Sequence, residues 1–427
     1  MTDMQQIFTE YAPQYLDQYK DRIPKNHIKA IEAITACRTA DAGIVVCDCT
    51  GCGQVHVSFR SCGNRHCNIC QGHKTRTWLE KQCDRQLPGH HFMITFTIPE
   101  QLRTFFRSNQ RVAYEALFAA SSQTIKTFAA DPKFVGGDLP GFFGVLHTWG
   151  RQLQYHPHIH YIVTGGAVST SDGRWHPSRL DFFAPVKAMS KVFRAKLKDL
   201  LKAGGLLHLI DSRVWKQAFN VNSQHVTGSH HSIKYLAPYV FKVAITNGRI
   251  IKVEENNVVF RYKKPKSSRW RTMSLPVMEF IRRFLQHVLP TGFMKVRYYG
   301  FMGAKPRVNR EQIRALIELA FGFETPDPPR KKMSQPALLS PECGSRLVLR
   351  YVTASRFGPA RAAGYAQDIA ETKKSDNAAS GRQDICGLPA YTTPKTGLIF
   401  QRTNRASGNN KCFLIKPGTW PEKCHPL

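Results

Sequence analysis

Two histidines spaced for metal binding lie in the segment from 156 to 164, which reads His-Pro-His-Ile-His-Tyr-Ile-Val-Thr. In an extended strand, His158 and His160 leave the same face of the sheet, about 7 Å apart along the strand. Ile159 and Tyr161 then face the other way. Because imidazole nitrogens are common ligands of divalent metals, the pair is a candidate metal site.

A third histidine lies in the strand-like segment 142–149, which precedes this pair and contains His147. If residues 150–154 connect an antiparallel hairpin, His147 falls opposite His158 on the same face. The pattern therefore predicts a triad of His147, His158 and His160. An isolated His-x-His pair is more often a pair of polar residues on a solvent-exposed sheet face. The histidine on the neighbouring strand favours a metal site here.

Two tyrosines four residues apart, Tyr235 and Tyr239, follow later in the chain. On a helix they would share a face. A tyrosine can act as a covalent nucleophile, and the basic neighbours Lys234 and Lys242 would ease its ionisation. Tyrosines at this spacing are usually core residues, and Pro238 between them disturbs a helix. The nucleophile hypothesis therefore requires Tyr235 in the first turn or a kinked helix.

A cysteine-rich module precedes all of these residues. Cys49-x2-Cys52 and Cys67-x2-Cys70 are separated by fourteen residues. Each Cys-x2-Cys turn presents two thiolates, and two such turns complete a tetrahedron around zinc. The alternative is a set of buried free thiols. Other residues of the same region leave open a different ligand set or a second ion, namely Cys47, Cys62, His56, His66 and His73.

The charge of the chain is strongly basic. The 427 residues contain 61 Lys and Arg against 30 Asp and Glu, a net charge of +31. This excess indicates a polyanionic partner, and we expect that partner to be nucleic acid. No stretch is apolar enough to span a bilayer, and the polar start does not resemble a secretory signal. We therefore expect a cytosolic protein with reduced cysteines and no membrane partner.

Candidate nucleic-acid contacts cluster in three places. The stretch 263–271 combines basic residues with an aromatic ring, which can clamp a single strand by charge and stacking; the alternative is a solvated loop. Basic residues also surround the cysteine module and the tyrosines. The predicted DNA-binding residues are Arg65, Lys74, Arg76, Lys234, Lys242, Lys263, Lys264, Lys266, Arg269, Trp270 and Arg271.

The predicted elements alternate irregularly between strands and helices, which indicates an α+β fold. Residues 5–40 read as two helices, 91–99 as a strand and 101–130 as a long helical region. Residues 184–203 form a helix with a basic face. Residues 249–262 form a hairpin that turns at 255–257, and 278–289 form an amphipathic helix.

The His-hydrophobic-His pair followed by Tyr-x3-Tyr resembles the two-tyrosine HUH endonucleases. The match is closest to rolling-circle transposases of bacterial insertion sequences, of the insertion sequence 91 type. The segments that carry the resemblance are 146–150, 156–160, 235–239 and 297–300. The resemblance covers about residues 20 to 350. It depends on the histidine motif and the tyrosine motif together, since either motif alone would be weak evidence.

The resemblance implies a ferredoxin-like antiparallel sheet with the histidine pair on a central strand, preceded by a small zinc-ribbon domain with structural Zn²⁺. It implies that the histidine triad holds Mg²⁺ or Mn²⁺ while Tyr235 or Tyr239 attacks single-stranded DNA and forms a 5′-phosphotyrosine link. The expected partners are single-stranded DNA at transposon ends and targets, and host replication factors. The expected location is the bacterial cytoplasm, at the nucleoid.

The expected domain order is a helical and zinc-binding part at 1–85, a catalytic domain at 86–325, and a linker with a poorly ordered tail at 326–427. Ser340-Pro341-Glu342-Cys343 resembles the start of a second Cys-x2-Cys turn of the family, with Ser340 in place of the first cysteine. Three alternatives stay open: a plasmid replication initiator or relaxase with the same chemistry, a non-catalytic DNA-binding protein, and an RNA-binding zinc protein.

Overall fold

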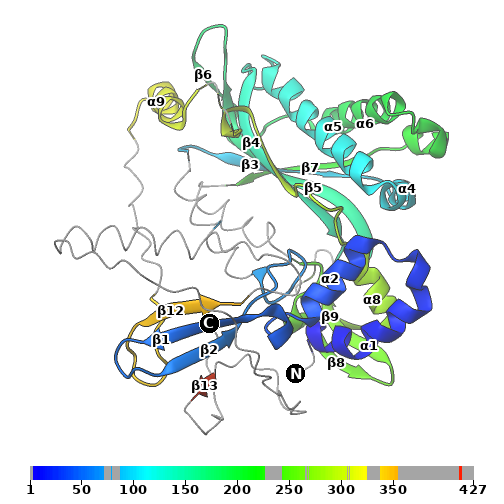
Figure 1. Cartoon of the computed structure of the whole chain (residues 1–427). Coiled ribbons are helices and arrows are strands. Elements are labelled where there is room, and N and C mark those ends of the chain that lie inside the picture. The colour runs from blue at the N-terminus through cyan, green and yellow to red at the C-terminus, as the bar shows by residue number, and fades with distance from the viewer. Residues whose placement is uncertain are drawn as a thin grey trace, which may run out of the picture. The chain divides into compact units, whose positions relative to one another are not determined.

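The computed structural model describes residues 3–71, 78, 87–226, 243–264, 267, 269–304, 306, 308–324 and 337–353, with the backbone of 413–415. Contacts divide the chain into two compact units. The first combines Ala36–Cys62 with Pro336–Leu427, and the second combines Thr2–Thr35 with Gly63–Gln335. Figure 1 colours the elements in chain order.

The first unit is built on an antiparallel sheet in the order β12-β1-β2-β13. Its strands are β1 (Ile44–Cys49), β2 (Val55–Phe59), β12 (Leu347–Val352) and β13 (Phe413–Ile415). The hairpin of β1 and β2 is extended by β12, which pairs with β1 although it comes from the far end of the described chain (Figure 1). A segment beyond residue 336 therefore completes the N-terminal sheet.

The second unit contains the largest sheet, in the order β11-β4-β5-β3-β7, with β6 beside β5. Its strands are β3 (His91–Thr97), β4 (Leu139–Trp149), β5 (Tyr155–Val168), β6 (Trp175–Pro177), β7 (Asn220–Val226) and β11 (Val296–Tyr299). All neighbours are antiparallel. Along the chain, β3, a helical region, β4, β5, a helix and β7 follow the ferredoxin-like βαββαβ order. The predicted fold class is confirmed, and β5 lies in the middle of the sheet.

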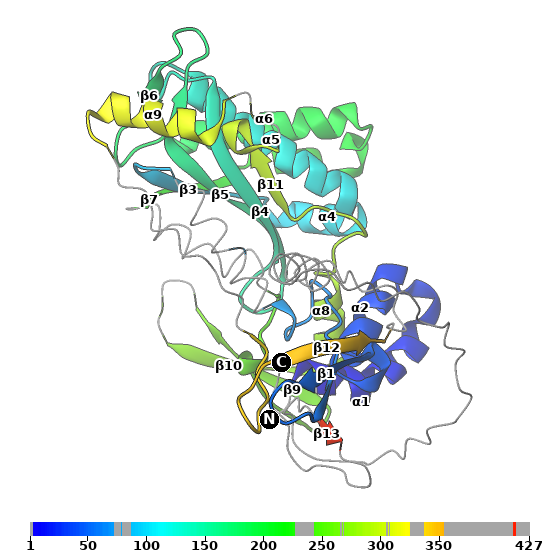
Figure 2. The same cartoon turned by 60° about the vertical axis from the view of Figure 1, so that its left-hand side comes forward.

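Helices cover one face of this sheet, as Figure 2 shows for α5 and α6, which lie side by side. These helices are α4 (Arg103–Ser108), α5 (Gln110–Ala130) and α6 (Val186–Ala203). The core between sheet and helices joins Phe96, Ile159 and Tyr161 to Phe118 of α5 and Phe193 of α6. Because strand residues alternate between faces, the residues next to these point to the opposite face, where the histidines lie.

The remaining part of the second unit consists of a three-stranded meander and short helices. The elements are α1 (Met4–Tyr19), α2 (Lys25–Thr35), β8 (Ile250–Glu254), β9 (Asn257–Lys263), β10 (Trp270–Pro276), α8 (Val277–Leu285) and α9 (Arg310–Phe321). Phe8 of α1 packs edge-on against Phe284 of α8, with ring centroids 5.4 Å apart. Between β8 and β9, Glu255 and Asn256 have φ of +49° and +59°, the conformation that a tight hairpin turn requires.

The expected elements are present: two helices within 5–40, strand β3, the long helical region, α6, the β8–β9 hairpin and α8. The expected boundaries differ from the structure at the C-terminal end, because residues 347–352 are a paired strand rather than part of a linker and tail. Within the described ranges, no helix combines the length and apolarity needed to cross a bilayer.

Candidate active site and metal centres

The histidine triad lies on the β4–β5 hairpin, on the sheet face away from α5 and α6. The strand register puts His147 opposite His158, as the sequence predicted, and Val145 opposite His160. One ring nitrogen from each of the three histidines lies within 4.8 Å of those of the other two. The ring centroids of His158 and His160 are 4.8 Å apart, and that of His147 lies 5.4 Å and 5.0 Å from them.

Two of the three rings are oriented through their Nδ1 atoms. His158 Nδ1 lies 2.6 Å from the His156 carbonyl oxygen, and His160 Nδ1 lies 2.9 Å from Thr95 Oγ1 on β3. When Nδ1–H donates to these oxygens, Nε2 of each ring carries the lone pair that binds metal. Thr95 stands opposite His160 in the register of β3 and β5, so the sheet itself supplies this support.

His147 packs against an aromatic neighbour. Its ring stacks on Trp149, with centroids 4.9 Å apart and planes 26° apart. Lys295 Nζ lies 5.2 Å from the centroid of the same indole. Burial, with repulsion from the Arg65 guanidinium, lowers the pKa of Lys295 to about 7. The triad is thus connected to a buried basic group that the sequence did not reveal.

The donor set fits a divalent ion with open positions. Three neutral imidazoles from adjacent strands leave the remaining coordination sites to water or to substrate oxygens. Mg²⁺ prefers oxygen ligands, whereas imidazole suits the transition metals better. Of the two ions expected from the sequence, the triad therefore fits Mn²⁺ better than Mg²⁺.

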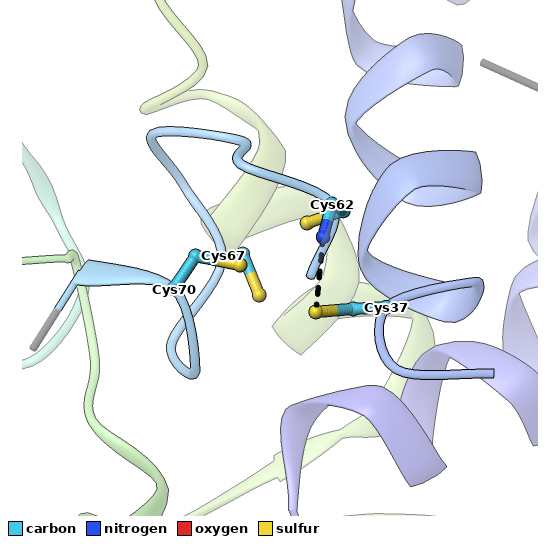
Figure 3. Close-up of side chains that lie close together, drawn as sticks. All are labelled: Cys37, Cys62, Cys67 and Cys70. Carbon is cyan, nitrogen blue, oxygen red and sulfur yellow. Dashed lines mark hydrogen bonds between the residues drawn. The ribbon is translucent and has the colours of Figure 1, made fainter. Parts of the chain in front are cut away.

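A cluster of four cysteines comprises Cys37, Cys62, Cys67 and Cys70, with all four Sγ atoms within 4.8 Å of one another. Figure 3 shows the four side chains converging, with the backbone N–H of Cys62 donating to Cys37 Sγ at 3.5 Å. Four thiolates at such distances match a tetrahedral zinc site, and amide donors to sulfur are the usual support of metal thiolates.

The four predicted zinc ligands fall into two groups in the structure. Cys67 and Cys70 lie in the four-cysteine cluster, whereas Cys49 and Cys52 lie in a separate group with His56. Strand β2 lies between the two Cys-x2-Cys turns along the chain.

Arg65, predicted to contact DNA, has another role. Its guanidinium donates to the carbonyl oxygens of Phe293 at 2.5 Å and Pro290 at 2.8 Å. Burial lowers the pKa of Arg65. The side chain therefore fixes the loop that carries Cys67 to the segment after α8, and its donors are engaged by protein oxygens.

The predicted DNA-binding stretch lies on the β9–β10 ribbon. Trp270 is half exposed and stands opposite Lys263 in the strand register. Lys263 Nζ and Arg261 Cζ each lie 4.9 Å from the indole centroid. Lys264, Arg269 and Arg271 are exposed beside it. The ribbon thus presents an aromatic ring among cations, the composition that single-stranded nucleic acids favour.

Several predicted residues lie outside the described ranges: Tyr235, Tyr239, Lys234, Lys242, Lys74, Arg76 and Lys266. Their roles stay predictions.

The sequence did not reveal Cys37, Thr95, Arg261 and Lys295, and it left Cys62 open as part of a different ligand set or a second ion site. Cys62 and Gly63 repeat the Cys-Gly pair of Cys52 and Gly53, a local signal that could have identified a turn. Cys37 and Thr95 carry no local signal, because only the folded strands bring them to their sites.

Comparisons with known proteins identify the family of the chain. Residues 141–310 match the family model described as "Putative transposase", and residues 7–98 match the model described as "Transposase zinc-binding domain". The first range contains the triad, and the second contains the four-cysteine cluster. No solved structure shows a significant match to the chain.

Two curated relatives cover most of the chain. A protein of Sinorhizobium fredii named "Putative transposase y4qJ" is 35% identical over 342 residues, which cover 75% of this chain and 85% of the relative. The "Transposase for insertion sequence element IS801" of Pseudomonas savastanoi pv. phaseolicola is 25% identical over 351 residues, 75% of this chain and 82% of the relative. The chain therefore belongs to the two-tyrosine transposases of the insertion sequence 91 type, which carry an N-terminal zinc-binding domain.

Proposed function

We propose that this transposase nicks and rejoins single-stranded DNA through a 5′-phosphotyrosine intermediate during rolling-circle transposition. The observation that supports this most directly is the convergence of His147, His158 and His160 on one sheet face, with ring nitrogens within 4.8 Å. Such a site suits phosphoryl transfer, because a divalent ion held there would neutralise charge on a non-bridging oxygen of the scissile phosphate.

In the proposed reaction, the hydroxyl of Tyr235 or Tyr239 loses its proton and attacks phosphorus. The bond from phosphorus to the 3′ oxygen breaks, and that oxygen takes up a proton to become a free 3′-hydroxyl. The 5′ phosphate stays on the tyrosine. Thr95 and the His156 carbonyl hold the rings of His160 and His158 in place. Rejoining is the reverse attack by a 3′-hydroxyl, so it needs no ATP.

We propose that the β9–β10 ribbon holds the single strand and that a zinc ion stabilises the cluster of Cys37, Cys62, Cys67 and Cys70. Trp270 supplies a stacking surface, and Lys263 supplies a cation at the face of its ring. The free 3′-hydroxyl left by nicking can prime synthesis, so host replication factors are expected partners. The substrate places the protein at the nucleoid of a bacterial cell.

The test is an adduct assay with 5′- and 3′-labelled single-stranded oligonucleotides that tile the DNA flanking the gene, with Mn²⁺. Wild-type protein should give a covalent adduct that survives denaturation. The variant His160→Ala and the double variant Tyr235→Phe/Tyr239→Phe should give none. His176→Ala removes a half-buried histidine on β6, outside the triad, and serves as the matched control.

An adduct formed equally by wild type and His160→Ala across a Mn²⁺ titration would contradict the proposal. A replication initiator or relaxase shares this chemistry but would cut at an origin. Cleavage at the ends of the mobile element therefore supports transposition, and cleavage only at a plasmid-type origin opposes it.

A further inference from the structure

Two turns of the first unit have the same backbone geometry. In one, the Gly53 N–H donates to the Cys49 carbonyl at 3.1 Å, and in the other the Gly344 N–H donates to the Ser340 carbonyl at 2.9 Å. Both glycines are left-handed, with φ of +67° and +70°. The two turns are therefore equivalent structures, although only the first reads Cys-x2-Cys.

A second pair of hydrogen bonds extends the equivalence. The Cys49 N–H donates to the Gln54 carbonyl at 2.9 Å, and the Ser340 N–H donates to the Ser345 carbonyl at 2.7 Å. By this correspondence Ser340 occupies the place of Cys49, and Cys343 that of Cys52. The turns also touch, because a Cβ added to Gly51 would lie 2.2 Å from Ser345 Oγ.

The two turns bring their sulfurs together. Cys49 Sγ and Cys343 Sγ are 3.3 Å apart, far longer than a disulfide bond of about 2.05 Å. Two sulfurs on one tetrahedral zinc lie about 3.8 Å apart when each Zn–S bond is about 2.3 Å. Ligand atoms of Cys49, Cys52 and His56 lie within 4.8 Å of one another. The spacing is therefore close to that of zinc-bound thiolates.

Ser340 stands where the matching turn has a cysteine, so a hydroxyl oxygen occupies the position of a fourth thiolate. Its buried Oγ accepts from the backbone N–H groups of Glu342 at 3.3 Å and Cys343 at 3.5 Å. A neutral hydroxyl is a poor zinc ligand, since structural zinc sites use thiolate, imidazole or carboxylate. Another residue must complete the set.

His56 is positioned to do so. It is buried, at 4% exposure, and its Nε2 lies 3.2 Å from Ser340 Oγ. Within the described ranges, its Nδ1 is buried and has no hydrogen-bond partner. When Nε2–H donates to the serine, Nδ1 carries the lone pair that a metal requires, the usual arrangement of a metal-bound histidine with a supporting oxygen.

We propose that the first unit binds a second structural Zn²⁺ through Cys49, Cys52, Cys343 and His56, with Ser340 orienting the histidine. The site is distinct from the cluster of Cys37, Cys62, Cys67 and Cys70 and independent of the nicking reaction. It joins the β1–β2 hairpin to the segment that precedes β12. The ion therefore ties the C-terminal strand to the N-terminal sheet.

The primary test is the zinc content of the purified full-length protein. In a His158→Ala/His160→Ala background, which removes the triad as a further site for zinc, the chain should hold two zinc ions, and adding Cys343→Ala or Cys67→Ala should leave one. Cys47→Ala removes a buried cysteine of β1 that belongs to neither cluster, and it should keep both ions. Ser340→Ala should weaken the second site about 10- to 100-fold in a competition with a chromophoric chelator. One zinc per chain in this background, unchanged by Cys343→Ala, would overturn the proposal.

A second measurement needs no variant. Cys52 and Cys343 are exposed, so free thiols there should react at once with iodoacetamide. In zinc-loaded wild type, mass spectrometry should find both protected, and both alkylated after chelation. Immediate alkylation of Cys343 in the loaded protein would also overturn the proposal. In cobalt-loaded protein, the spectrum of three thiolates and one imidazole should move toward that of four thiolates in Ser340→Cys; no change there would contradict the role assigned to His56.

Discussion

At the scale of single residues, the site is defined by what holds each histidine rather than by the histidines alone. His158 and His160 each use Nδ1 on an oxygen, whereas His147 is held by stacking on Trp149. The contacts described for the three rings are thus two hydrogen bonds and one aromatic stack. Because such supports set which nitrogen of a histidine can bind a metal, each of them can be tested by substitution.

Thr95→Val tests the hydrogen-bonded support. Valine keeps the shape of the side chain but removes the hydroxyl next to His160 Nδ1. We expect Mn²⁺ affinity to fall about 10- to 100-fold, with DNA affinity unchanged. Isothermal titration with Mn²⁺ measures the first, and fluorescence anisotropy of a labelled oligonucleotide measures the second.

The matched control is Thr97→Val, two residues along the same strand face and opposite His158 in the register. The described contacts give Thr97 no hydrogen bond to the triad. Equal losses of Mn²⁺ affinity in the two variants would mean that the Thr95 hydroxyl does not orient His160.

At the scale of elements, two antiparallel ribbons carry the proposed function. The β4–β5 hairpin lines up the triad through its register, and the β9–β10 ribbon places Trp270 opposite Lys263. Both depend on strand pairing that local sequence patterns indicate well, since period-2 alternation and turn residues lie within a short stretch.

Trp270→Ala tests the second ribbon. The loss of one stacking surface is worth about 1–3 kcal/mol, so affinity for single-stranded DNA should fall about 5- to 150-fold. Zinc content and stability should not change, because Trp270 is half exposed. Fluorescence anisotropy at a fixed salt concentration provides the measurement.

Ile251→Ala removes another exposed apolar side chain from the same sheet, on β8, and should leave DNA affinity as it was. The ribbon would have no role in binding if Trp270→Ala bound DNA as tightly as this control.

At the scale of the whole molecule, buried histidines make stability depend on pH. Burial, with repulsion from His90, lowers the pKa of His91 to about 4, and burial lowers that of His287 to about 3. The unfolded chain binds these protons near pH 6.5. Their neutral forms thus favour folding above pH 6.5, and that stability is lost as the pH falls toward 4 and 3.

Between its pKa in the folded chain and its pKa in the unfolded chain, each such histidine should change the free energy of unfolding by about 1.4 kcal/mol per pH unit. His287→Gln keeps a donor and an acceptor near Leu153 and Thr148 but cannot titrate. Urea unfolding measures how much the free energy of unfolding falls between pH 7 and pH 5. This fall should be about 2 kcal/mol smaller in the variant than in wild type. An equal fall in both proteins would show that His287 does not control the pH dependence of stability.

The distance along the chain between contacting residues decides which contacts could be predicted from the sequence. His147 was found because its partner lies across a short hairpin, so register alone fixes the contact. The sequence did not group Cys37 with Cys62, Cys67 and Cys70, because Cys37 lies in an earlier segment and only the folded chain brings it to them. The ferredoxin-like strand order was expected from the resemblance, because composition and periodicity predict helices and strands but not which strands pair with each other.

The central claim is that a tyrosine of the pair Tyr235 and Tyr239 becomes linked to a 5′ phosphate in a reaction that needs the histidine triad. The most direct measurement is peptide mapping of the adduct formed by wild-type protein on single-stranded DNA with Mn²⁺, after nuclease digestion. The account predicts a nucleotide attached through its 5′ phosphate to the peptide containing Tyr235 or Tyr239, and no such peptide from His160→Ala. A nucleotide linked through its 3′ phosphate, or attached to any other residue, would contradict it.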